Sequence, residues 1–221
     1  MPVRDILLAL VLATVLGLSF VAIHVGLEEV SPLLLTALRY TFAALPAVFL
    51  VRRPDVPWRL LVVYGLCIGV GQFGILFIAI ALGMPAGLSS LVIQLQVFFT
   101  VLLAFLVFGE RPRLWQVAGA LVGFTGIAVI ATERLEGAVL VPLLLTVLAA
   151  LFWGLGNTAS KRAGRVDMLR FVVWSSLVPP LPLLAASLVF EGPGAIPAAL
   201  EHITWRGVGA IAFMAYGATL F

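Results

Sequence analysis

Long apolar runs alternate with short polar connectors along the whole chain. A helix needs about 20 mainly apolar residues to cross a bilayer, and we identify eight runs close to this length. The connectors between them are too short to form separate folded domains. The pattern therefore predicts an all-α integral membrane protein. The expected helices are residues 5–27, 32–51, 59–82, 86–108, 114–131, 139–160, 169–190 and 204–221.

Small residues and prolines inside these runs predict how the helices start, pack and bend. Ser31 followed by Pro32 predicts an N-cap and a first turn for the second helix. Gly65 and Gly69 form a small-xxx-small pair, which allows two helices to approach closely. Pro46 and the prolines of the seventh helix predict kinks in helices two and seven.

Basic residues gather on alternate connectors. With the N-terminus in the cytoplasm, ten of the 13 Lys and Arg residues fall in the inner segments 1–5, 52–59, 109–113 and 161–170. This asymmetry predicts a cytoplasmic N-terminus in a bacterial inner membrane. The first run is too long for a signal peptide and has no cleavage site, so we interpret it as a retained helix.

A weak internal repeat divides the chain. The stretch around Gly17 resembles the stretch around Gly154 at an offset of 137, and Pro46 matches Pro182 at an offset of 136. Five helices separate the copies, so the second copy must lie upside down in the membrane. Inverted repeats are typical of secondary transporters. We expect one repeat over 1–133 and a second over 138–221, the second ending after three helices, so that eight of an expected ten helices are present.

Composition agrees with a membrane location. Hydrophobic residues make up 63% of the chain and charged residues only 10%, against about 25% charged in soluble domains. A net charge of +3 gives no reason to expect nucleic acid as a partner. Lipid and a small-molecule substrate are the expected partners, and a homodimer is left open. The single cysteine, Cys67, excludes an internal disulfide, and no cofactor or metal site is expected.

Nine stretches of the chain, spread over both halves, form a familiar set: Gly17–Ile23, Leu38–Tyr40, Gln72–Phe73, Gly83–Val92, Gln94, Gln96, Phe98–Thr100, Phe108–Arg111 and Val173–Pro179. In these stretches the chain resembles EamA-type transporters of the drug/metabolite transporter superfamily, and most closely its O-acetylserine/cysteine exporters. This resemblance implies ten helices in two inverted repeats, cytoplasmic termini and export of amino-acid metabolites. Two features differ from the family: His24 stands where lysine is frequent, and the last two helices are absent.

Polar side chains within the predicted helices are candidate substrate ligands, because each costs free energy in lipid unless it is satisfied. Gln72, Gln94 and Gln96 lie near the middle of their helices and offer both donors and acceptors. The two glutamines of the fourth helix point about 200° apart, so at most one faces a central cavity squarely. Hydrogen bonds between helices are the alternative role for all three.

Other candidates have equally plausible structural roles. Arg39 could bind a carboxylate bidentately or could pair with backbone carbonyls. Ser19 and Asn157 could line a cavity or pack helices together, and Trp153 and Phe73 could wall the cavity or face lipid. His24 is a candidate for proton coupling; the alternative is an interfacial residue satisfied by Glu28 or water.

The acidic residues narrow the possible functions. All ten fall in connectors or at helix ends, which argues against an exporter of lipophilic cations and against an intramembrane aspartyl protease. Zinc-helix and nucleophile-elbow motifs are absent from the sequence, so we expect no enzyme. The favoured function is alternating-access export of a small polar amino-acid metabolite, such as O-acetylserine or cysteine. The alternatives are a non-transporting membrane scaffold and a transporter of another solute class in the same superfamily.

Overall fold

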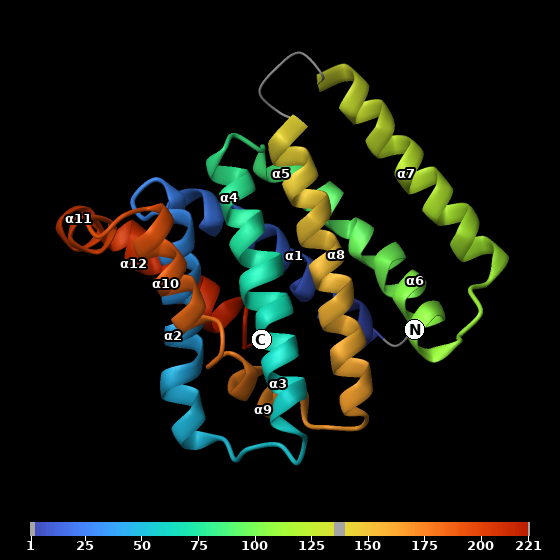
Figure 1. The fold of residues 1–221 in the computed structure, drawn as a ribbon, viewed down its shortest axis with the longest axis horizontal. Helices are drawn as coiled ribbons and strands as arrows, with labels where there is room; N and C mark the ends of the chain where they lie inside the picture. Colours follow the sequence, from blue (N-terminus) through green and yellow to red (C-terminus); the bar gives the residue numbers. More distant parts are fainter. Residues whose placement is uncertain (1–2, 135–139, 221) are drawn as a thin grey trace.

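The computed structural model describes residues 3–134 and 140–220, and every regular element in these ranges is a helix (Figure 1). In chain order the helices are α1 (Val3–Leu27), α2 (Pro32–Leu50), α3 (Trp58–Gly65), η1 (Leu66–Gly74), α4 (Ile75–Ala81), α5 (Ala86–Val92), η2 (Ile93–Leu95), α6 (Gln96–Phe108), α7 (Leu114–Arg134), α8 (Leu140–Ala163), α9 (Met168–Ser175), α10 (Pro180–Phe190), α11 (Ala195–His202), α12 (Trp205–Ala212) and η3 (Phe213–Gly217).

The prediction of an all-α membrane protein is confirmed. Within the described ranges, six helical segments are long and apolar enough to cross a membrane, and the apolar part of α7, Leu114–Val129, is shorter. The third, fourth and seventh predicted helices are each built from two or three consecutive elements. The six segments are Arg4–Leu27, Pro32–Leu50, Trp58–Ala81, Ala86–Phe108, Leu140–Ala163 and Met168–Phe190.

The C-terminal part differs from the prediction of one helix over 204–221. Helix α12 begins at Trp205, passes into the π-helix η3 and ends at Gly217. At 1.5 Å per residue these elements span about 20 Å, which is less than the thickness of a bilayer core. The short helix α11 precedes them in a segment that was expected to be a loop. The total of eight crossing helices therefore stays a prediction.

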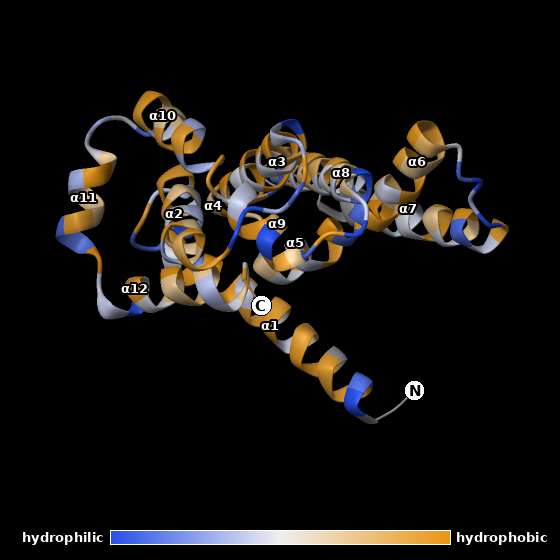
Figure 2. Ribbon diagram, turned by 90° about the horizontal axis from the view of Figure 1, so that it is seen from below, coloured by the Kyte–Doolittle hydropathy of each residue, from blue (hydrophilic) through white to orange (hydrophobic). Residues whose placement is uncertain are grey.

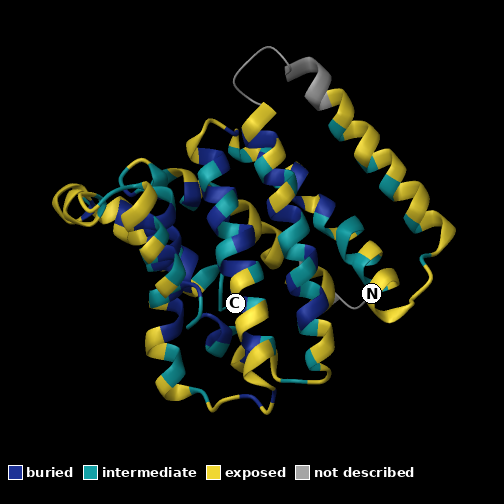
Figure 3. Ribbon diagram, in the orientation of Figure 1, coloured by how far each residue is buried: buried dark blue, intermediate teal, exposed yellow. Residues whose placement is uncertain are grey.

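Helix α8 lies at the centre of the bundle. It packs against α3, η1, α4 and α6, while α2 packs against α10 and α1 against α12. Buried residues gather along these contacts, whereas α7 and the first half of α1 are mostly exposed (Figure 3). Seen from below, α1 projects away from the other helices with an apolar surface (Figure 2). Such exposed leucine-rich surfaces are what lipid contacts in a membrane protein.

The connectors lie at two opposite ends of the bundle (Figure 1). Residues 51–57 and 164–167 lie at the lower end, and residues 109–113 lie on the right, where Glu110 accepts a hydrogen bond from Lys161 near the lower end of α8. We call this end the basic end because each of the three connectors carries arginine. Residues 28–31 and 82–85 lie at the upper end, which we call the opposite end.

The start of α2 is built differently from the predicted cap. Ser31 is the N-cap residue and Pro32 opens the first turn, as expected, but the Ser31 side chain caps no backbone group of α2. The Glu191 carboxylate, at the end of α10, instead accepts the backbone N–H groups of Leu33 and Leu34. A side chain 157 residues away therefore caps the helix.

The two helices predicted to kink at prolines differ in the structure. Helix α2 continues through Pro46 to Leu50 without a break in its helical assignment, and its kink stays a prediction. The seventh predicted helix is interrupted, because residues 176–179 between α9 and α10 are not helical. Pro179 and Pro180 lie at this break, and a proline cannot donate the hydrogen bond that would continue a helix.

Candidate functional site

A cavity of about 180 Å³ lies in the middle of the bundle, and we call it the central cavity. Residues from α1, α2, α3, η1, α8 and α9 line it, together with residues just after η3. A smaller pocket of about 50 Å³ shares several of its walls and is otherwise lined by Ser19 and by apolar side chains such as Ile23, Leu76 and Ile93. The polar residues of the central cavity are Arg39, Tyr40, Tyr64, Gln72, Ser175, Ser176 and Thr219.

Arg39 is the charged residue of this cavity, and only 1% of its surface is exposed. Its Nε donates to Oγ1 of Thr219 at 2.9 Å, and its guanidinium carbon lies 3.8 Å from the centre of the Phe73 ring. Its Nη1 atom is buried without a hydrogen-bond partner. No acidic residue of the described ranges forms a salt bridge with it. The cavity wall therefore presents an unneutralised cation, held over an aromatic ring.

Gln72 lies on η1, a π-helical stretch in the middle of the third span. Local π-helical geometry is frequent at functional sites, because it re-aims side chains within a helix. Gln72 is 2% exposed, and its Oε1 atom is buried without a hydrogen-bond partner. The central cavity thus has an unpaired acceptor as well as an unpaired donor.

The helix containing Gln72 lies close to the break between α9 and α10. A Cβ atom on Gly65 would lie 2.5 Å from the Ser175 carbonyl oxygen, and one on Gly69 would overlap the Pro179 ring. The close helix packing predicted for this glycine pair is therefore confirmed. It brings the wall carrying Gln72 against the interrupted backbone.

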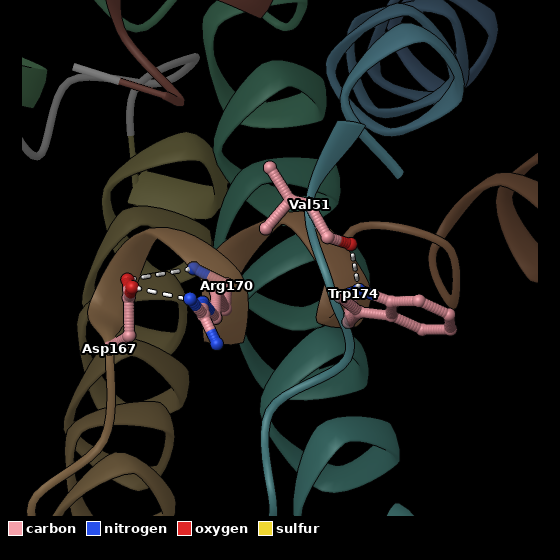
Figure 4. A network of polar contacts seen from close by, with 4 residues as sticks. All are labelled: Val51, Asp167, Arg170 and Trp174. Carbon is pink, nitrogen blue, oxygen red and sulfur yellow. Dashed lines mark hydrogen bonds and ion pairs between the residues drawn. The ribbon is translucent and has the colours of Figure 1, made fainter. Parts of the chain in front are cut away.

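Figure 4 shows how α9 is held at the basic end. Asp167 caps the helix: its Oδ1 accepts the Arg170 backbone N–H at 3.2 Å, and its Oδ2 lies 3.1 Å from Nε of the same arginine. One turn later, Nε1 of Trp174 donates to the Val51 carbonyl at 3.0 Å. Ser175 and Ser176 follow directly, so these contacts fix the position of both serines in the cavity wall.

Five of the predicted site residues lie around the central cavity and the smaller pocket beside it. Arg39, Gln72, Phe73 and Trp153 line both the central cavity and the smaller pocket. Ser19 lines the smaller pocket alone, and its hydroxyl donates to the Val15 carbonyl in the same helix at 2.7 Å.

Gln96 and Asn157 lie elsewhere, in a polar contact between α6 and α8. The Asn157 amide nitrogen donates to Oε1 of Gln96 and to Oγ1 of Thr100, both at 3.0 Å. The contact corresponds to the interhelical alternative raised for Gln96 and to the helix-packing alternative raised for Asn157. Neither residue lines the central cavity.

Gln94 and His24 point away from the central cavity. Gln94 is exposed and lines an open groove of about 470 Å³ beside α7, opposite Gly123. His24 is exposed, and its Nε2 lies 3.8 Å from a carboxylate oxygen of Glu28. These two candidates therefore do not line the central cavity or the smaller pocket, where the other five lie.

The cavity also contains polar residues that were not predicted: Tyr40, Tyr64, Ser175, Ser176 and Thr219. One sequence signal could have identified the two serines, since they shortly precede Pro179 and Pro180 in the middle of an apolar run. Adjacent prolines predict an interrupted helix, and polar groups beside an interruption are candidates for a cavity wall.

The lining suits binding better than bond-breaking chemistry. The residues around the central cavity include no Asp, Glu, His or Cys that could act as a general base or nucleophile. In the described ranges, no group of three or more His, Cys, Asp and Glu side chains could hold a metal ion. What the cavity offers is one cation, several hydrogen-bonding groups and aromatic faces.

Comparison with known proteins places these observations in context. The EamA-like transporter family matches residues 4–132. The chain is 43% identical to a probable amino-acid metabolite efflux pump of Salmonella typhimurium and 40% identical to one of Escherichia coli; each match covers 98% of this chain and 75% of the relative. It is 32% identical to a probable terminal-alkyne amino-acid exporter of Streptantibioticus cattleyicolor. A crystal structure with a TM-score of 0.59 and 25% identity covers 96% of this chain and 78% of its own.

Proposed function

Because the chain belongs to the EamA-like transporter family, we propose that it exports small amino-acid metabolites across the bacterial inner membrane and binds them in the central cavity. Three relatives named as exporters of amino acids or their metabolites support this substrate class. O-acetylserine and cysteine are the specific candidates. Binding rests on the residues that line the central cavity rather than on the family alone.

The single observation that carries the proposal is the unpaired guanidinium of Arg39. Burying a permanent charge without a counter-charge is costly, and such groups within a membrane usually face a ligand path or a partner. The partner we propose is the substrate carboxylate, which can accept from the free Nη1 atom. The bond from Nε to Thr219 and the stacking on Phe73 hold the guanidinium in place before the substrate arrives.

The shape of the cavity and the distribution of basic residues support a direction of transport. Tyr64 and Ser175, which line the wider central cavity, lie on α3 and α9, two of the helices that begin at the basic end. The smaller pocket is closed by Ile23 and Leu76, each 1% exposed. We propose that the basic end faces the cytoplasm. Substrate then enters the cavity from the cytoplasmic end. It leaves when the apolar side chains that close the smaller pocket move apart, and this cycle is alternating access.

A transport assay with Arg39 variants tests the proposal. The purified chain, reconstituted in liposomes, should catalyse saturable uptake of labelled L-cysteine or O-acetyl-L-serine. Arg39→Lys keeps the charge but not the planar fork, and Arg39→Gln removes the charge. A charge-assisted bond contributes about 1.5–3 kcal/mol, so the KM should rise roughly 10- to 100-fold for Arg39→Gln and less for Arg39→Lys.

A competition experiment separates carboxylate binding from folding. Unlabelled L-cysteine should inhibit uptake by the wild-type protein much better than its methyl ester does, and Arg39→Gln should lose this discrimination. Gln94→Ala, outside the cavity, is the matched control and should behave like wild type. If the ester competes as well as the free acid, Arg39 does not bind the carboxylate. If the folded chain transports no amino-acid derivative, the scaffold alternative is favoured.

A further inference from the structure

The break in the seventh span exposes backbone acceptors at membrane depth. Residues 176–179 lie roughly 12–17 Å from the start of α9 at 1.5 Å per residue, close to the middle of a hydrocarbon core about 30 Å thick. In a regular helix the carbonyls of Ser176 and Val178 would accept from the N–H groups of residues 180 and 182. Both of these residues are prolines and have no N–H.

These two carbonyl oxygens find no replacement donor in the protein. Among the described residues, no hydrogen bond to the Ser176 or Val178 carbonyl is formed by backbone or side chain, whereas the neighbouring Ser175 carbonyl accepts from the Val178 N–H at 3.1 Å. Unsatisfied backbone at this depth is tolerated only where it lines a cavity or meets a ligand. The break borders the central cavity through Ser175 and Ser176.

The serine hydroxyls at the break present acceptors to the cavity. The Ser175 hydroxyl donates to the Val172 carbonyl at 3.0 Å, and the Ser176 hydroxyl donates to the same oxygen at 2.7 Å. A hydroxyl has one proton, so each has only lone pairs left for a ligand. Both serines are 2% exposed. This wall therefore offers acceptors, as does the unpaired Oε1 of Gln72 on the adjoining helix.

We propose that this wall, formed by Ser175, Ser176 and the freed Ser176 carbonyl with Gln72 beside them, is the subsite for a substrate ammonium group. The inference rests on the proposed function and deepens it. Arg39 supplies a donor and a positive charge on another wall of the same cavity, so the site has two poles. A molecule with a free carboxylate and a free protonated amine satisfies both poles. The substrate class is thus α-amino acids with an unmodified amine, and N-acylated derivatives are rejected.

A panel of competitors tests this subsite in the reconstituted protein. Uptake of labelled L-cysteine is measured against unlabelled L-cysteine, N-acetyl-L-cysteine and 3-mercaptopropionate, which keep the carboxylate and differ at the amine. We expect wild type to favour the free amine by about tenfold or more, the factor that corresponds to a lost charge-assisted contact. In the double variant Ser175→Ala/Ser176→Ala this preference should fall at least severalfold, while inhibition by 3-mercaptopropionate stays unchanged.

Two further variants control for a general effect of substitution on transport. Ser90→Ala removes a hydroxyl on α5 that lies outside the central cavity and donates to the Gly87 carbonyl, and it should keep the wild-type preference. Pro180→Leu restores an N–H donor toward the Ser176 carbonyl and should weaken the amine preference without removing either hydroxyl.

The outcomes distinguish the subsite from the proposed function. Equal competition by all three carboxylates in wild type overturns the ammonium subsite and leaves the carboxylate site at Arg39 standing. Failure of every carboxylate to compete overturns the proposed function itself. If the serine variant keeps its amine preference but loses a dependence on sodium ions, the acceptors bind a free cation and the inference is wrong.

Discussion

The carboxylate of Glu191 joins the end of α10 to the beginning of α2, and we predict that Glu191→Gln destabilises the bundle measurably. In the structure Oε1 accepts the Leu33 N–H at 2.7 Å. Oε2 accepts the hydroxyls of Ser31 at 2.7 Å and Ser187 at 2.6 Å, and the Leu34 N–H at 3.3 Å. One side chain therefore satisfies two of the donors that a helix start leaves open.

The size of the effect follows from these contacts. Glutamine keeps one acceptor oxygen but replaces the other with a donor, and it removes the charge that favours the positive end of the α2 dipole. Loss of a helix cap costs about 0.5–2 kcal/mol, and loss of a charge at a helix start about 0.3–1 kcal/mol. A total near 2 kcal/mol lowers the melting temperature of a chain of this size by roughly 4–8 °C.

The single cysteine provides the assay. Cys67 is partly buried on η1, so a thiol-reactive dye labels it faster as the bundle opens on heating. Glu201→Gln is the control, because Glu201 is an exposed carboxylate on α11. If Glu191→Gln and Glu201→Gln melt within about 1 °C of each other, the cap across the bundle contributes little and the reasoning is refuted.

Three further predictions use the same protein. Gly83 has a φ of +98°, so Gly83→Ala should cost about 1–2 kcal/mol by the thiol assay, whereas Gly87→Ala, with open space around it, should be neutral or stabilising. Hydrogen bonds from the start of α12 lower the pKa of Glu29, so this contact stabilises the fold above the ordinary carboxylate pKa and is lost as the pH falls through the lowered value. The protection factor of the first α12 amides against hydrogen exchange, which is corrected for the intrinsic pH dependence of exchange, should fall in acid, and Glu29→Gln should abolish that fall. A double-mutant cycle of Asn157→Ala and Gln96→Ala should give a coupling of about 0.6–1.7 kcal/mol, and a value near zero would contradict the contact between α6 and α8.

The lengths of the apolar runs predicted most of the fold, because every segment that crosses lipid must be apolar and long enough to span the hydrocarbon core. The spans that begin at Pro32 and Trp58 match their predicted ranges to within a residue. The helix predicted for 204–221 was wrong in extent: the helical segment Trp205–Gly217 is shorter, and its last part is the π-helix η3. Hydropathy measures how apolar a segment is, and it does not detect where the backbone departs from regular α-helical hydrogen bonding.

Polar residues in the middle of the predicted helices could be identified as candidate site residues from the sequence. The sequence could not show which of them line the central cavity. Gln94 and Gln96 are two positions apart, so the helical rotation between them points their side chains in different directions. Which side chain meets a neighbouring helix depends on where α7 and α8 lie, and the sequence does not give that. Serine is ambiguous from sequence, since its hydroxyl can satisfy itself on the preceding turn, as Ser19 does on Val15. Ser175 and Ser176 do the same on Val172, yet they still line the cavity. The sequence therefore could not separate a self-satisfied serine from a ligand-binding one.

The separation of donors from acceptors in the cavity depends on both predicted halves of the chain. Arg39 comes from the first half, but Thr219 in the second half holds its Nε and leaves Nη1 free. Gln72 likewise comes from the first half, whereas the serines beside it come from the break in the second. The first half alone carries one group of each polarity, Arg39 and Gln72, but the serines of the proposed ammonium subsite come only from the second half. A movement of one half against the other would therefore separate Arg39, proposed to bind the carboxylate, from the two serines proposed to bind the ammonium, and substrate release would follow from that separation without a change of protonation in the cavity.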